Sequence, residues 1–251
     1  GSEMCIRDSG ISSRFGSEVV SGIERVAEEN GYSLLLSGFA DQPEKIDQKI
    51  EYLMKHAIDG LIVFLSEEEW SGFEMLTKMS IPVVALNCPD EPAGIDTIVV
   101  NDRESVARVI AHHGEQGHKT IGFIAAAQTD YVARERLAGA KEAVQKDPSI
   151  HLEIFTGDYS RKSGYYGAKA LLEKRATAIF VSNYNMSIGA IECFNQEGVR
   201  IGKDIAFSHY DYLDKNDLSI LPKITITPPT DKIGERAAEQ LLKRIKKEEE
   251  E

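Results

Sequence analysis

Long apolar runs are missing from this chain of 251 residues. None approaches the ~20 consecutive apolar residues that a membrane-spanning helix requires, and the sequence around Met4 has no signal-peptide core. We therefore expect neither contact with a membrane nor secretion. The chain is 42% hydrophobic and 28% charged, which is typical of a globular protein.

Cysteine is scarce. The sequence has three, Cys5, Cys88 and Cys193, and they are not spaced as metal ligands. An odd number of cysteines without such spacing is typical of a reducing compartment, so we expect a cytoplasmic protein.

Basic residues are outnumbered by acidic ones, 29 against 41, and the net charge is −12. Part of the acidic excess lies in residues 248–251, which we interpret as a solvated tail. The negative net charge argues against a chain that binds nucleic acid by itself.

Catalytic motifs are also missing. The sequence contains no Gly-x-Ser-x-Gly elbow, no Walker loop and no Rossmann glycine triplet. Cys88 ends a predicted strand, but no histidine is placed to activate it. His112 and His113 are adjacent, so on a helix they would face apart and make a poor metal pair. We therefore expect no enzyme, no metal site and no cofactor.

The most informative stretch that is present runs from Thr177 to Gly198. An apolar run at 178–181 predicts a buried strand, a polar turn containing Asn183 follows, and an apolar stripe at helical spacing ends at Gly198. Ligands of open α/β sheets bind at the carboxyl ends of strands. The amide of Asn183 offers the donors and the acceptor that a hydroxylated ligand needs.

Strands and helices alternate in this way along the whole chain, in two series. We therefore predict an α/β protein with two Rossmann-like lobes, each built on a parallel sheet. The first lobe is expected to comprise residues 11–117 and 228–251, and the second residues 118–227. The stiff pair Pro228-Pro229 would return the last helix to the first lobe. Residues 1–10 show neither a strand nor a helix period, and we interpret them as lead sequence outside the fold.

Several segments share their order and spacing with one family, although each is weak alone: GIERVAEENGYSLLL (22–36), IDGLIV (58–63), GHKTIGFI (117–124), RERLAGAKEA (134–143) and FVSNYNMSIGAIECFNQEGVRIGKDIA (180–206). From about residue 12 to 247, the chain resembles the effector-binding core of lactose- and galactose-repressor-type bacterial transcription regulators. That core is itself similar to periplasmic sugar-binding proteins.

The resemblance implies a cleft between the lobes that closes on a small effector such as a sugar. Motif matches assign Arg136 of the R-L-A-G pattern to ligand hydroxyls or a carboxylate, and Tyr159 to packing on the effector. The resemblance implies these ligand-binding residues: Ser12, Ser13, Phe15, Arg136, Tyr159, Asn183 and Asp211. We expect Arg136, Asn183 and Asp211 to converge at the carboxyl edge of one sheet.

Each assignment has a structural alternative. Arg136 could be a surface arginine paired with Glu135 or Glu142, and Asn183 could be a simple helix N-cap. Asp211 could serve a turn, whereas Tyr159 and Phe15 could belong to the core.

The sequence departs from the family pattern at several positions. The family has a strand before Ile11, and we do not expect the segment 3–9 to form it. Neither the DNA-binding helix-turn-helix nor the strand that closes the family core is recognised, so we interpret the chain as a fragment. Tyr184, His209 and His113 replace an aspartate, a glycine and a leucine, which predicts an altered ligand specificity.

These features predict the ligand-sensing domain of a transcription regulator, which would control DNA only through a helix-turn-helix module absent from this chain. The alternative is an extracytoplasmic sugar-binding protein of a transport system. The resemblance also implies a homodimer, with Trp70, Phe73, Met75 and Phe194 on helices predicted at 67–79 and 186–198 as candidate interface residues. These apolar side chains could instead simply cover the sheets.

Overall fold

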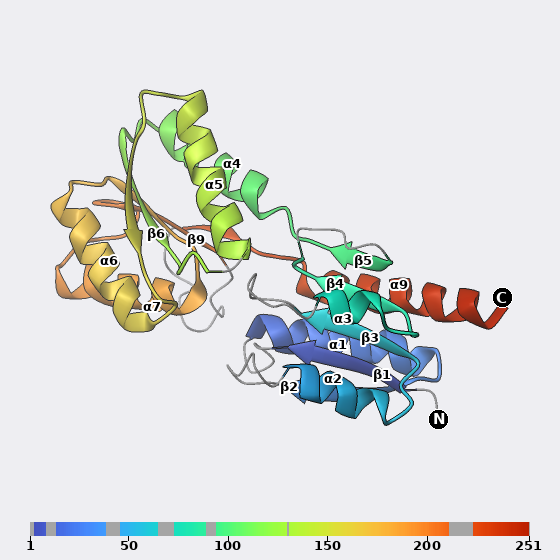
Figure 1. Ribbon diagram of the computed structural model, residues 1–251. Helices are drawn as coiled ribbons and strands as arrows, with labels where there is room; N and C mark the ends of the chain where they lie inside the picture. The colour runs from blue at the N-terminus through green and yellow to red at the C-terminus, as the bar shows by residue number, and fades with distance from the viewer. Residues whose placement is uncertain are drawn as a thin grey trace. The chain divides into compact units, whose positions relative to one another are not determined.

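The structure is a computed structural model, and it describes residues 3–8, 14–38, 46–64, 73–88, 94–129, 131–210 and 223–250. Of these, residues 3–8, 14, 38, 46, 47, 49, 73, 74 and 248–250 are described by their backbone only. The chain divides into two compact units, shown in Figure 1. Unit 1 comprises Gly1–Val100 and Pro229–Glu251, and unit 2 comprises Asn101–Pro228.

Unit 1 is built on a parallel sheet with the strand order β2-β1-β3-β4-β5. Its strands are β1 (Glu3–Asp8), β2 (Ser33–Gly38), β3 (Gly60–Phe64), β4 (Val83–Leu86) and β5 (Ile95–Ile98). Its helices are α1 (Arg14–Glu29), α2 (Ile46–Met54), α3 (Phe73–Thr77) and α9 (Thr230–Glu250).

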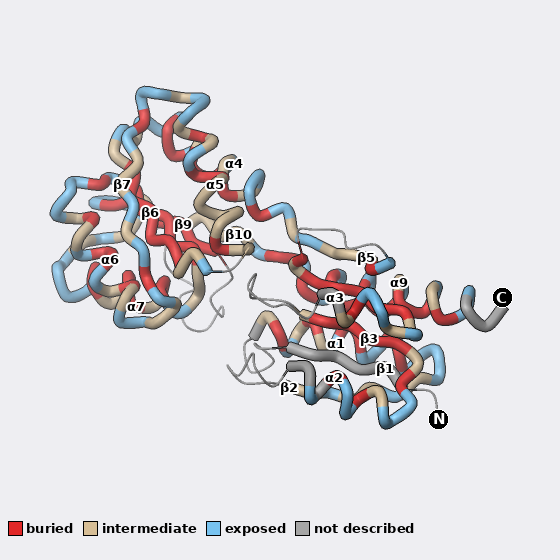
Figure 2. Tube along the Cα trace, viewed as in Figure 1, coloured by how far each residue is buried: buried red, intermediate tan, exposed pale blue. Residues whose placement is uncertain are grey.

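Alternate residues of the central strands serve two cores, because successive strand side chains point to opposite faces. Ile62 and Val84 pack with α1 and α9 on one face of the sheet. Leu61 and Val83 pack with α2 and α3 on the other face. The tube in Figure 2 accordingly shows β3 buried along most of its length. The α/β layering predicted for this lobe is therefore confirmed.

The prediction that residues 1–10 lie outside the fold is wrong for the segment Glu3–Asp8. This segment forms β1, which lies between β2 and β3 in the sheet of unit 1. Cys5 is opposite Leu35 on one side and Leu61 on the other. The strand forms because both neighbours offer backbone hydrogen-bonding groups that would otherwise be unpaired.

Unit 2 is built on a second parallel sheet with the strand order β10-β9-β8-β6-β7. Its strands are β6 (Thr120–Ala125), β7 (His151–Thr156), β8 (Ala178–Val181), β9 (Ala206–Tyr210) and β10 (Ile224–Ile226). Its helices are α4 (Asp102–Glu115), α5 (Tyr131–Lys146), α6 (Arg161–Glu173) and α7 (Tyr184–Gln196).

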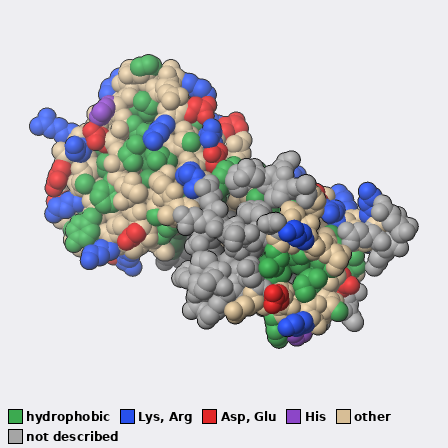
Figure 3. Space-filling view, in the orientation of Figure 1, with side chains coloured by type: hydrophobic (Ala, Val, Ile, Leu, Met, Phe, Trp, Pro, Cys, Tyr) green, Lys and Arg blue, Asp and Glu red, His purple; other side chains and the backbone are tan. Residues whose placement is uncertain are grey.

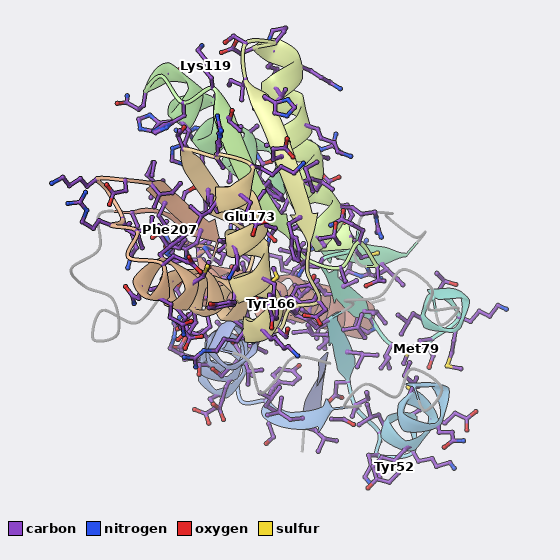
Figure 4. All side chains as sticks on the ribbon, turned by 90° about the vertical axis from the view of Figure 1, so that its left-hand side faces the viewer. Tyr52, Met79, Lys119, Tyr166, Glu173 and Phe207 are labelled. Atoms are coloured by element: carbon purple, nitrogen blue, oxygen red, sulfur yellow. The ribbon has the colours of Figure 1, made fainter. Side chains whose placement is uncertain are left out.

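Two cores again flank the sheet. Phe123 and Phe180 stack at 5.2 Å between ring centroids on the face covered by α4 and α5. Phe207, labelled in Figure 4, meets Phe194 of α7 at 6.0 Å on the opposite face. Phe194 is fully buried there. Its assignment as an interface residue is therefore wrong, because the apolar stripe of α7 faces its own sheet.

Glycines lie where the helices that cover these faces approach each other closely, α4 with α5 and α6 with α7. A Cβ atom on Gly139 of α5 would lie 2.2 Å from the carbonyl oxygen of Arg103 in α4. One on Gly189 of α7 would lie 1.8 Å from the carbonyl oxygen of Arg161 in α6. No side chain fits at such distances, so glycine allows the backbones of paired helices to touch.

The expected lobe boundary at residue 117 is wrong, because α4 belongs to unit 2. Val106 and Ile110 of this helix are fully buried in the core beneath α5. The described part of the helix predicted at 67–79 is α3, and Trp70 lies outside the described residues. Among the residues that the structure describes, no helix is both long and apolar enough to cross a membrane.

Candidate functional site

The carboxyl edge of the unit 2 sheet collects most of the described residues that the sequence singled out. Lys119, labelled in Figure 4, precedes β6 and marks the opposite, amino-terminal edge. At the carboxyl edge, Ser182 and Asn183 follow β8 directly, and Tyr210 is the last residue of β9. Parallel strands bring these ends together.

Arg136 reaches this edge from α5. Its Nη1 donates a hydrogen bond of 2.7 Å to the carbonyl oxygen of Ser182. Its Nε lies 3.3 Å from Oδ1 of Asp102. Its Cζ lies 3.4 Å from the ring centroid of Tyr210, so the planar guanidinium covers the ring. The side chain is 11% exposed, which excludes the alternative of a surface arginine.

The two acidic residues proposed as alternative partners of Arg136 bind elsewhere. Glu135 accepts hydrogen bonds from Arg103, and Glu142 accepts one from Lys146. Arg136 instead pairs with Asp102, the first residue of α4, whose side chain is 3% exposed. A carboxylate at a helix N-terminus also interacts favourably with the helix dipole.

Asn183 is the N-cap of α7. Its Oδ1 accepts hydrogen bonds from the backbone N–H groups of Asn185 at 2.9 Å and Met186 at 3.3 Å. The capping alternative is therefore confirmed, and it uses the oxygen only. The NH2 group of Asn183 has no partner within the described part of the chain. It remains a candidate donor to a ligand.

Ser182 adds a buried hydroxyl next to this amide. The residue is 1% exposed, and its Oγ has no hydrogen-bond partner among the residues that the structure describes. A buried polar atom without a partner is uncommon and costs stability. The site therefore holds a hydroxyl and an amide NH2 group that a ligand could satisfy.

Tyr159 lies in the turn between β7 and α6 with a φ of 68°. This left-handed conformation is strained for a bulky aromatic residue. Hydrogen bonds hold the turn: the N–H of Ser160 donates to Asp158, the N–H of Asp158 donates to Ser163, and Ser160 caps α6. Bonds from Ser160 and Ser163 lower the pKa of Asp158 to about 2. Tyr159 is half-buried and packs against the core under α6 and α7, so it partly fulfils the core alternative.

Two buried histidines lie in the same sheet region. Nε2 of His113 is 2.8 Å from Oγ of Ser208, and Nε2 of His209 is 3.0 Å from Oγ1 of Thr225. Burial lowers the pKa of each ring to about 4. Both side chains are therefore neutral at physiological pH and hold strands and helices together through hydrogen bonds. The described residues contain no cluster of three potential metal ligands.

The remaining predicted site residues lie elsewhere. Ser12, Ser13 and Asp211 fall outside the described residues, so the predicted meeting of Asp211 with Arg136 and Asn183 stays a prediction. Phe15 belongs to unit 1, where it meets Phe64 at the carboxyl end of β3 with ring centroids 5.5 Å apart. Both rings are half-buried and pack against the core under α1 and α9.

Sequence reasoning missed four residues at these edges: Asp102, Ser182, Tyr210 and Phe64. Tyr210 and Phe64 each end an apolar run at the carboxyl end of a strand, and this position could have indicated them. Nothing in the local pattern pairs Asp102 with an arginine 34 residues away.

Comparison with known proteins identifies the family of the chain. Residues 9–251 match the family described as periplasmic binding proteins and sugar binding domain of LacI family. The chain is 30% identical over 233 residues to the HTH-type transcriptional repressor PurR of Actinobacillus pleuropneumoniae serotype 3, covering 91% of this chain and 69% of that protein.

Two solved structures share the fold. The lac repressor dimer bound to operator and the anti-inducer ONPF has a TM-score of 0.87 at 23% identity, covering 98% of this chain and 88% of that one. The Cra transcriptional dual regulator from Pseudomonas putida, in complex with fructose 1-phosphate, has a TM-score of 0.83 at 20% identity, covering 98% and 92%. The chain belongs to the family of periplasmic binding proteins and sugar binding domains of the LacI family.

Proposed function

We propose that the chain is the ligand-sensing domain of a transcription regulator and that it binds a small hydroxylated metabolite, such as a sugar, at the carboxyl edge of the unit 2 sheet. The observation that carries this proposal is the position of Arg136. Its guanidinium lies on Tyr210 and bonds the carbonyl of Ser182, at the ends of two adjacent strands. Asn183 is next in the chain, so its NH2 group lies at the same strand end.

The chemistry of the edge suits a ring that carries hydroxyl groups. A guanidinium offers up to five N–H donors in a fixed plane, and the NH2 group of Asn183 adds further donors. The hydroxyl of Ser182 can donate or accept. Tyr159 supplies an aromatic face, and Asp211 is proposed as the acidic acceptor for ligand hydroxyls.

Sensing requires that the effector bind one conformation better than another, because only differential affinity shifts a population. The response would reach DNA through a separate helix-turn-helix module. The charge of the described surface is consistent with a domain that binds the effector and leaves DNA binding to another module. Figure 3 shows Lys and Arg side chains of unit 2 interspersed with Asp and Glu on this face, and the whole chain has a net charge of −12. Such a surface does not attract the phosphate backbone.

Three further points belong to this proposal. The domain acts in the cytoplasm, forms a homodimer and carries out no catalysis. The similarity to transcriptional repressors favours a sensor over the transport-receptor alternative. Light scattering that shows only a monomer of 27.8 kDa at high concentration would count against the dimer.

Isothermal titration calorimetry tests the sensing function with six compounds: D-galactose, D-glucose, D-ribose, fructose 1-phosphate, hypoxanthine and adenine. We expect at least one to bind, and Arg136→Ala to weaken that binding by about 1–3 kcal/mol, because a buried partner loses its hydrogen bond. Arg200→Ala is the matched control, since Arg200 is exposed and bonds Asp204 in a distant turn. If none of the six binds a folded sample at millimolar concentration, the proposed function is wrong.

A further inference from the structure

Asp102 is a buried carboxylate whose side chain bonds a residue of the proposed effector site. It begins α4, its side chain is 3% exposed, and its Oδ1 lies 3.3 Å from Nε of Arg136. Buried carboxylates are rare unless they are paired. Within the described part of the chain, the side chain of Asp102 pairs with the proposed ligand-binding arginine, which indicates a role in that site.

We propose that Asp102 is a positioning residue for effector binding, because its carboxylate fixes the direction in which Arg136 presents its guanidinium. The inference rests on the proposed function of Arg136. Asp102 itself need not touch the effector. It acts through the arginine.

Among the described residues, three groups that contact the guanidinium help to define its plane. Asp102 holds Nε, the carbonyl oxygen of Ser182 holds Nη1, and the ring of Tyr210 lies beneath Cζ. The Ser182 carbonyl and the Tyr210 ring come from the sheet, whereas Asp102 comes from α4. Asp102 is the member of the three that carries a negative charge, so its bond to Arg136 joins two opposite charges.

Fixing this side chain in advance matters for affinity. A free arginine side chain can adopt many rotamers, and ordering it at the moment of binding reduces the affinity. Arg136 is ordered before the effector arrives if Asp102 and Tyr210 hold it. Losing Asp102 would release the guanidinium at one edge and allow it to rotate away from the strand ends.

The chain offers a matched control for the simpler idea that Asp102 only ties two helices together. The next residue of α4, Arg103, pairs with Glu135, the residue before Arg136 in α5. This pair joins the same two helices with a bond of 2.6 Å, but Arg103 is 50% exposed and both carboxylate oxygens of Glu135 accept hydrogen bonds from Arg103. Breaking it removes a tie between α4 and α5 and leaves the bond between Asp102 and Arg136 in place.

The experiment compares Asp102→Ala, Asp102→Asn and Glu135→Ala with the wild type by calorimetric titration of the six compounds named above. We expect Asp102→Ala to weaken binding about tenfold or more, the loss typical of a charge-assisted hydrogen bond. Asp102→Asn retains an oxygen acceptor and should recover part of the affinity. Glu135→Ala should stay within about twofold of the wild type, because exposed ion pairs contribute little.

A second readout needs no effector. In the ligand-free protein, the Nε–Hε proton of Arg136 should exchange slowly with solvent in nuclear magnetic resonance spectra. It should exchange fast in Asp102→Ala and remain protected in Glu135→Ala. If Asp102→Ala does not fold, Asp102→Asn provides both readouts, with a smaller loss expected in each.

Several results would overturn the inference. Equal losses of affinity in Asp102→Ala and Glu135→Ala would show that Asp102 is only a tie between helices. Unchanged affinity in Asp102→Ala, or an Arg136 proton that stays protected in that variant, would show that Asp102 does not position the arginine. Absence of binding by all six compounds to the wild type would instead contradict the proposed function, and the Arg136 proton would still decide whether Asp102 holds the side chain.

Discussion

The guanidinium of Arg136 covers the ring of Tyr210, with 3.4 Å between Cζ and the ring centroid. Tyr210 ends β9 and is 1% exposed, so the ring is a fixed platform. A planar cation on such a platform presents its remaining N–H groups along one plane. Tyr210 of the unit 2 sheet therefore orients the N–H donors of Arg136 that we propose bind the ligand.

Replacing Arg136 with lysine should test whether the planar fork matters beyond its charge. Arg136→Lys retains a positive charge beside Asp102, but it loses the stacking on Tyr210 and the fixed directions of the donors. We expect effector affinity to fall about tenfold or more, while the free energy of unfolding changes by less than about 1 kcal/mol. Calorimetry and urea denaturation measure the two quantities. Equal affinity in the lysine variant would mean that the effector reads only charge.

Asn183 should show two separable roles. Asn183→Ser retains an oxygen that can cap α7 but removes the NH2 group, whereas Asn183→Ala removes both. We expect the alanine variant to lose about 1 kcal/mol of stability and the serine variant much less. Both should bind effector more weakly. If the serine variant binds as the wild type does, Asn183 is a cap and has no role in ligand binding.

The sequence predicted the α/β layers of this fold correctly, but it predicted less well which sheet or unit each strand and helix belongs to. Parallel α/β order follows from apolar runs that alternate with helical stripes, which are local signals. The segment Glu3–Asp8 has no such signal, because central strands of parallel sheets usually read as continuous apolar runs. It forms a strand because it pairs with β2 on one side and β3 on the other. That pairing is set by residues far along the chain.

The same limit explains the assignment of α4 and the composition of the site. A helical stripe at 102–115 shows that a helix forms, but not which sheet it covers. Its place is set by Gly139, which lets α5 approach the backbone at Arg103. Arg136 was indicated by a motif, whereas its partners Asp102 and Tyr210 come together only in the folded chain.

Close packing of α6 against α7 should make glycine irreplaceable at position 189. In Gly189→Ala the new Cβ would lie 1.8 Å from the carbonyl oxygen of Arg161 and 2.8 Å from the backbone nitrogen of Tyr165. Backbone atoms cannot move aside singly, so the helices must separate. We expect a loss of about 1–3 kcal/mol or more in urea denaturation.

Gly114→Ala is the matched control for this packing prediction. It makes the same substitution in α4, where the new Cβ would meet Cδ1 of Ile150 at 2.4 Å. That atom is the end of a flexible side chain, which can rotate away, and alanine favours the helix. We expect a change within about 1 kcal/mol. A similar loss in both variants would show that helix separation is not the cause.

Acid should destabilise the protein well above the range in which carboxylates titrate, because His113 and His209 must be neutral in the folded state. Burial, followed by the charges of His118 and His112, lowers the pKa of His113 to about 4. Burial, followed by the charge of Lys223, lowers the pKa of His209 to about 4. In the unfolded chain both rings titrate near their ordinary pKa of 6.5. The unfolded state therefore binds more protons in this window, so the stability from both residues is fully present above about pH 6.5 and is lost as the pH falls toward about 4.

Urea denaturation as a function of pH measures this effect. Between about pH 7.5 and 5 we expect the free energy of unfolding to fall by about 2 kcal/mol for each histidine. The double variant His113→Gln, His209→Gln should flatten this dependence, because a glutamine amide can bond Ser208 or Thr225 without titrating. His56→Gln is the control, since His56 is exposed just after α2 and its Nδ1 lies 2.8 Å from the carbonyl oxygen of Tyr52. An equally steep loss in the double variant and in the control would assign the acid sensitivity to other groups and contradict the prediction.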